Sequence, residues 1–129
     1  MPTFEFRKLV RDDIVNHQVA SGARPEYRIL SPEEHKKELV RKIIEEAGEI
    51  LDAGPESVAE EIADVQQALD DLKTKYGLSD DDIAEAQTAK NAKNGAFSKG
   101  IYIERVEVPE GDAWVEYYRN NPDRYPEII

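Results

Sequence analysis

The sequence contains no cysteine, which excludes disulfides and thiolate metal sites. It also has no apolar run long enough to cross a membrane. Residues 1–6 lack the basic start and the apolar stretch of a signal peptide. These absences favour a cytoplasmic protein without membrane attachment.

Basic residues are scarce: 17 Lys and Arg stand against 28 Asp and Glu, so the net charge is −11. We therefore expect no nucleic-acid partner, because phosphate contacts along a polymer need clustered Lys and Arg. A small phosphorylated ligand is compatible with this charge if Mg²⁺ or Mn²⁺, which prefer oxygen ligands, lies between it and the protein. A Gly-rich phosphate loop is also missing, so kinase and GTPase functions have no support.

The remaining composition is that of a globular chain, with 129 residues, 40% hydrophobic and 35% charged. We expect one domain over residues 1–129, with a loosely held tail from about residue 121. Caps, glycines and apolar spacing predict five helices. They cover residues 8–20, Ser31 to Gly54, Pro55 to Gly77, Ser79 to about Lys93, and 113–120. Residues 101–108 alternate like a short strand or extended arm. The predicted fold is an all-α bundle of four to five helices.

The second and third predicted helices form the clearest pair, because the join between them is too short for anything but antiparallel neighbours. Apolar residues alternate in steps of three and four along both helices, as in a packed seam. The predicted seam contains Leu39, Ile43, Ala47, Ile50 and Leu51, then Val58, Ile62, Val65, Leu69, Leu72 and Tyr76.

Two acidic pairs lie on these helices: Glu46 with Glu49, and Glu61 with Asp64. Each pair has i, i+3 spacing, which places both carboxylates on one helix face, and the pairs are symmetric about Pro55. Each acid also precedes a predicted seam residue. We therefore expect four converging carboxylates that bind one or two Mg²⁺ ions, with Mn²⁺ as a substitute. The alternative is an ordinary solvated acidic face.

Basic and polar residues elsewhere are candidates for phosphate contacts. Near the end of the fourth helix these are Lys90, Asn94 and Lys99, around Gly95 and Phe97, which we interpret as structural. On the first predicted helix, Lys8 and Arg11 are a surface pair unless that helix packs beside the acids.

The acidic motif Glu45-Glu46-x-x-Glu49 followed by Glu61-x-x-Asp64 resembles that of the MazG-like all-α nucleotide pyrophosphatases, which include dimeric dUTPases and phosphoribosyl-ATP pyrophosphohydrolases. Residues 8–12 (KLVRD) and 90–97 (KNAKNGAF) resemble segments of a house-cleaning subgroup. The resemblance spans roughly residues 8–105. Asp13 and Ala96 depart from the subgroup's pattern, which bears on the substrate more than on the chemistry.

The resemblance implies Mg²⁺-dependent hydrolysis between the α and β phosphates of a nucleoside triphosphate, which gives a nucleoside monophosphate and pyrophosphate. The implied metal ligands are Glu46, Glu49, Glu61 and Asp64, and Glu45 or Glu49 would accept a proton from water. The same resemblance, together with an uncovered side of the seam, implies a homodimer, with a tetramer as the second option. Glu61→Gln and Asp64→Asn are expected to abolish turnover.

Two other functions stay open. One is phosphoribosyl-ATP pyrophosphohydrolase activity in histidine biosynthesis, on the same fold. The other belongs to a different class: a non-catalytic helical interaction module whose acids are only solvated. The base, the sugar, and the choice between canonical and damaged nucleotides are not set by these residues.

Overall fold

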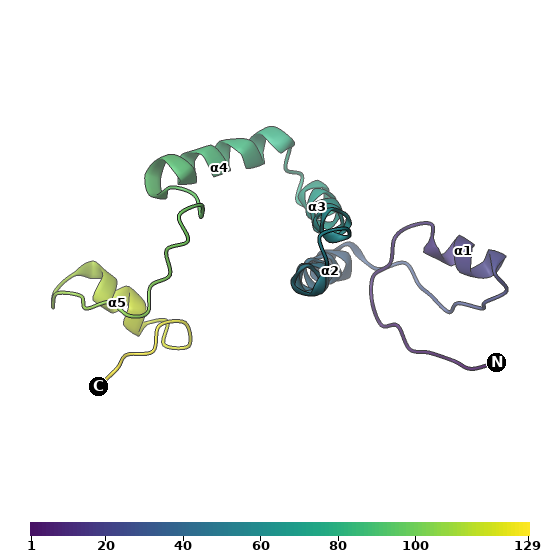
Figure 1. Ribbon diagram of the computed structural model, residues 1–129, viewed down its shortest axis with the longest axis horizontal. Helices are drawn as coiled ribbons and strands as arrows, with labels where there is room; N and C mark the ends of the chain where they lie inside the picture. The colour runs from purple at the N-terminus through teal and green to yellow at the C-terminus, as the bar shows by residue number, and fades with distance from the viewer. The chain divides into compact units, whose positions relative to one another are not determined.

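The computed structural model describes residues 1–129 and consists of five α-helices without a β-strand, which confirms the all-α prediction (Figure 1). The helices are α1 (Ile14–Ala20), α2 (Pro32–Asp52), α3 (Val58–Lys75), α4 (Asp80–Asn94) and α5 (Ala113–Arg119). None of them combines the length and the apolar character that a membrane-crossing helix needs.

The chain divides into two compact units, Met1–Ala89 and Lys90–Ile129. The first unit contains α1, α2, α3 and most of α4, and it carries the predicted acids. The second contains the end of α4 and all of α5.

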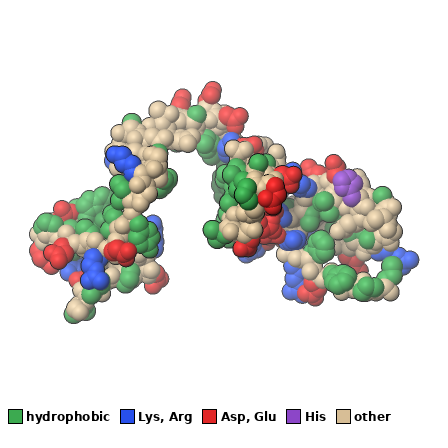
Figure 2. Space-filling model, in the orientation of Figure 1, with side chains coloured by type: hydrophobic (Ala, Val, Ile, Leu, Met, Phe, Trp, Pro, Cys, Tyr) green, Lys and Arg blue, Asp and Glu red, His purple; other side chains and the backbone are tan.

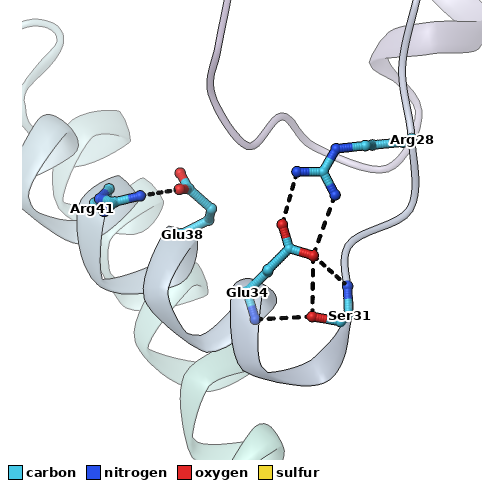
Figure 3. Close-up of polar contacts among 5 residues, drawn as sticks. All are labelled: Arg28, Ser31, Glu34, Glu38 and Arg41. Atoms are coloured by element: carbon cyan, nitrogen blue, oxygen red, sulfur yellow. Dashed lines mark hydrogen bonds and ion pairs between the residues drawn. The ribbon is translucent and has the colours of Figure 1, made fainter.

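A capping box begins α2 (Figure 3). The Glu34 amide donates to Ser31 Oγ at 3.3 Å, and the Ser31 amide donates to Glu34 Oε1 at 3.4 Å, so two otherwise unpaired amides are satisfied. Arg28 donates to the same carboxylate at 2.7 Å. The hydrogen bond from Arg28, followed by those from Ser31, lowers the pKa of Glu34 to about 2. One turn further on, Arg41 pairs with Glu38.

Helices α2 and α3 lie side by side as an antiparallel hairpin (Figure 1). Lys36, near the start of α2, lies 4.7 Å from the ring centre of Tyr76, which follows the end of α3. Leu39 and Ala68 are the two buried hydrophobic residues, at 2% and 6% exposure. The hairpin is therefore the structural centre of the first unit.

The seam of this hairpin differs from the predicted one. Its inner positions on α2 are 39, 43, 46 and 50, and on α3 they are 58, 61, 65, 68 and 72, all buried or half-buried. The predicted seam was wrong at five positions, which are exposed: Ala47, Leu51, Ile62, Leu69 and Tyr76. The physical reason is that steps of three and four describe two neighbouring stripes equally well, and only one of them faces the partner helix.

As a result, Glu46 and Glu61 occupy seam positions themselves instead of flanking the seam. The predicted flanking arrangement holds for the other two acids: Glu49 is exposed and Asp64 half-buried, each beside a half-buried apolar residue. Two carboxylates thus lie between the packed helices.

The predicted first helix was too long at its start, since α1 begins only at Ile14. Residues 8–13 are not helical, and side chains from this segment reach across to α2 and α3. Residues 101–108 form no strand, because no second strand offers the backbone groups that a ladder requires. In the second unit, Asp112 caps α5 by accepting from the Trp114 amide at 2.9 Å.

Candidate metal centre

Carboxylates from both helices of the hairpin converge on one point. Oxygens of Glu46 on α2 and of Glu61 and Asp64 on α3 lie within 4.8 Å of one another. A second group, formed by Glu45, Glu46 and Glu49 along α2, meets the same distance limit. Glu46 belongs to both groups. We call these five residues the acid cluster. Figure 2 shows acidic side chains gathered over α2 and α3, with basic side chains beside them.

Two oxygens of the acid cluster are buried without a hydrogen-bond partner: Oε2 of Glu46 and Oε2 of Glu61. Glu46 as a whole is only 8% exposed. A buried carboxylate oxygen that has lost its water and gained no donor is unfavourable by several kcal/mol in principle, and a cation offsets this cost. Because Mg²⁺ and Mn²⁺ prefer carboxylate oxygens, the donor set fits such an ion.

Three basic side chains already neutralise part of the cluster. Lys42 Nζ lies 3.2 Å from Glu45 Oε2 and 3.3 Å from Glu46 Oε1. Lys8 Nζ lies 3.1 Å from Glu45 Oε1. Arg11 Nη2 lies 2.6 Å from Asp64 Oδ1. Glu61 and Glu49 have no ion pair, so the three bases neutralise only Glu45, Glu46 and Asp64.

These surroundings shift the pKa values of the adjacent acids Glu45 and Glu46 in opposite directions. Burial raises the pKa of the Glu46 carboxyl above its ordinary value, and the Glu49 carboxylate adds to this effect against the opposing hydrogen bond from Lys42. Partial burial also acts to raise the pKa of Glu45, but hydrogen bonds from Lys8 and Lys42 outweigh it and the pKa is lowered. Glu45 therefore holds its negative charge more firmly than Glu46 does.

A groove of about 680 Å³ opens beside the cluster within the first unit. Residues 8–14 form one wall, and α2 and α3 contribute the other. Its lining includes Glu46 and Asp64 together with Lys8, Arg11 and Lys42. A groove that joins acids and bases in this way can accept a phosphorylated ligand with its counter-cation.

The structure places the sequence-predicted residues as follows. It brings Glu46, Glu61 and Asp64 together, and it puts Glu45 and Glu49 beside Glu46. Lys8 and Arg11 lie against the same acids. The second unit carries the remaining three as exposed residues: Lys90, Asn94 and Lys99.

Sequence reasoning missed Lys42. Its spacing to Glu45 and Glu46 is i, i+3 and i, i+4, which is the ordinary signature of ion pairs along a helix. The spacing was visible, but it is shared by many pairs in a chain that is 35% charged. What distinguishes Lys42 is that its side chain is only 19% exposed.

No family model, curated protein or solved structure matches this chain. The resemblance to the MazG-like pyrophosphatases stays a prediction from the sequence motifs. The acid cluster is the structural feature that bears on function.

Proposed function

We propose that this chain is a magnesium-dependent nucleotide pyrophosphohydrolase of the MazG-like kind, which hydrolyses a nucleoside triphosphate to a monophosphate and pyrophosphate. The observation that carries the proposal is the pair of buried, unpartnered oxygens on Glu46 and Glu61. Asp64 offers an oxygen within 4.8 Å of a carboxylate oxygen of Glu46 and of one of Glu61, so it would complete a three-carboxylate ligand set from two helices. Glu49 is the fourth predicted ligand. It belongs to the group of Glu45 and Glu46, and Glu46 is the residue that this group shares with Glu61 and Asp64.

When bound, Mg²⁺ would neutralise phosphate oxygens and lower the pKa of a coordinated water. Among the acids, Glu49 is better suited than Glu45 to accept the proton of the attacking water. Glu45 is held by Lys8 and Lys42 and its pKa is lowered, which weakens it as a base, whereas Glu49 carries no ion pair. The water oxygen would bond to the α phosphorus as the bond to the bridging oxygen breaks, and pyrophosphate would leave.

Basic residues supply the other half of a phosphate site. Lys8 and Arg11 line the groove and are proposed to contact phosphate oxygens. Lys90, Asn94 and Lys99 stay candidates for phosphate contacts from the sequence motif alone. Nucleotide-pool house-cleaning is the role that the sequence resemblance suggests.

We further propose that the chain acts as a homodimer, with a tetramer as the alternative. The hairpin has a second apolar stripe that its own helices leave exposed. Its members are Val40, Ile44, Ala47 and Leu51 on α2 and Ile62, Leu69 and Tyr76 on or next to α3. Their spacing in steps of three, four and seven is that of a helix-packing seam.

The direct test is pyrophosphate release from a panel of canonical and damaged nucleoside triphosphates and phosphoribosyl-ATP, with Mg²⁺ and with a chelator. We expect Mg²⁺-dependent release from at least one triphosphate. Glu61→Gln and Asp64→Asn should each lower kcat/KM by roughly a hundred-fold or more, because each removes a metal ligand. Glu60→Gln, which removes the same charge from an exposed neighbouring position, should keep nearly full activity.

Turnover of phosphoribosyl-ATP alone would select the histidine-biosynthesis alternative. Full activity in purified Glu61→Gln would refute the ligand assignment. If no substrate reacts and titration with Mg²⁺ produces no binding heat, the non-catalytic helical module replaces the proposed enzyme.

A further inference from the structure

Three basic residues form ion pairs with the acid cluster, and they come from two different parts of the chain. Lys42 lies on α2, the helix that carries its partners Glu45 and Glu46. Lys8 and Arg11 come instead from the non-helical residues 8–13. Their partners lie 37 and 53 residues further along the chain. Lys42 is therefore part of the helix that carries its partners, whereas Lys8 and Arg11 reach theirs from a segment outside the hairpin.

The pair between Arg11 and Asp64 involves one of the carboxylates proposed to bind a cation. Arg11 Nη2 is 2.6 Å from Asp64 Oδ1, and Asp64 shares its oxygen cluster with Glu46 and Glu61. A guanidinium and a divalent ion on the same carboxylate repel each other, and the repulsion is strong at separations of a few Å. The side chains of Arg11 and Asp64 are 60% and 34% exposed, so the pair itself is weak enough to exchange.

We propose that Arg11 is an exchangeable counter-ion: it holds Asp64 in the cation-free protein and is displaced when a divalent cation binds. The proposal rests on the proposed metal site and adds a second role for the N-terminal segment. Arg11 also lines the groove. Its five donors are then available for phosphate oxygens, which a guanidinium binds in bidentate fashion. Cation binding would thus prepare the groove for a phosphorylated ligand.

The first test is calorimetric titration of MgCl₂ and MnCl₂ into the full chain. Arg11→Gln should bind either cation roughly two- to five-fold more tightly than the wild type, the range that corresponds to an exposed ion pair. Arg7→Gln is the matched control, because Arg7 lies just before this segment in the same non-helical stretch but pairs only with Glu5. It should change the affinity by clearly less than Arg11→Gln does.

The second test follows the segment itself by limited trypsin digestion and mass spectrometry. Saturating Mg²⁺ should speed cleavage after Arg11 by roughly two- to five-fold, since the side chain is released from its ion pair. Cleavage after Arg7 serves as the internal reference. Slower cleavage at both sites would mean that the cation tightens the segment, which overturns the exchange.

The outcomes separate this inference from the proposed function. If the wild type binds Mg²⁺ and Glu61→Gln does not, but Arg11→Gln binds with unchanged or weaker affinity, Arg11 supports the site and the exchange is overturned while the metal site stands. If neither cation binds the wild type, both the metal site and the exchange are overturned.

Discussion

Glu46 is a carboxylate in a position where a packed helix ordinarily carries an aliphatic side chain. It lies in line with Leu39, Ile43 and Ile50 on the inner face of α2 and is 8% exposed. One of its oxygens forms an ion pair with Lys42, and the other has no hydrogen-bond partner. A buried acid of this kind lowers the stability of the cation-free fold and is typical of a functional site, because the same property creates affinity for a cation.

Neutralising Glu46 should therefore stabilise the protein in the absence of divalent cations. We expect Glu46→Gln to raise the free energy of unfolding by about 1 kcal/mol, or roughly 4 °C in Tm, measured by thermal denaturation with a chelator present. Addition of Mg²⁺ should raise the Tm of the wild type, because a ligand that binds only the folded state stabilises it, but should leave Glu46→Gln unchanged.

The control for this measurement is Glu60→Gln, which removes the same charge from an exposed position on α3. Its Tm should follow that of the wild type under both conditions. A lower Tm for Glu46→Gln in chelator would contradict the interpretation that the buried charge is unfavourable.

At the scale of the elements, the starts of α2 and α4 were predictable because their signals are local, whereas α3 begins three residues after the predicted Pro55 and has no side-chain cap. Ser31 caps α2, and at α4 Ser79 Oγ accepts from the Asp82 amide at 3.0 Å while Asp82 accepts from the Ser79 amide at 2.8 Å. Each of these two caps depends only on residues that are three positions apart in the chain. The start of α1 was missed because the side chains of residues 8–13 bind acids on other helices, and local spacing contains no information about such distant partners.

The start of α2 should be sensitive to acid. The hydrogen bond from Arg28 and those from Ser31 depress the pKa of Glu34 from 4.5 to about 2 in the folded protein. A depressed carboxyl pKa stabilises the fold above the unfolded value, so this contribution is complete above about pH 4.5 and is lost as the pH falls toward 2. We expect wild-type stability to fall across this interval and Glu34→Gln to show a shallower dependence, measured by urea denaturation at each pH.

Glu33→Gln is the neighbouring control, since Glu33 is exposed and pairs only with Lys36 in the next turn. Its pH dependence should match that of the wild type over the same range. Identical slopes for Glu34→Gln and the wild type would show that the Arg28 pair does not persist in solution.

At the scale of the whole molecule, the sequence predicted the helical class and the pairing of α2 with α3, and it placed Glu46, Glu61 and Asp64 near one another. It could not decide which stripe faces inward, because α2 and α3 each carry two apolar stripes. One stripe packs within the hairpin, and the other leaves Leu51 88% and Ile44 67% exposed. A second apolar stripe signals a further partner, but its spacing does not say whether that partner is another part of the chain or another copy.

The proposed homodimer makes this stripe its interface, and a charge placed there should break it. We expect Leu69→Glu to convert the dimer to a monomer at micromolar concentration, measured by sedimentation velocity, because a charge buried in an apolar seam costs several kcal/mol. Ala63→Glu, at an exposed position of α3 outside the stripe, should remain dimeric. Far-ultraviolet circular dichroism should show equal helix content in both variants. A folded Leu69→Glu that sediments as the wild-type dimer does would place the interface elsewhere, and a monomeric wild type would remove the dimer from the proposed function.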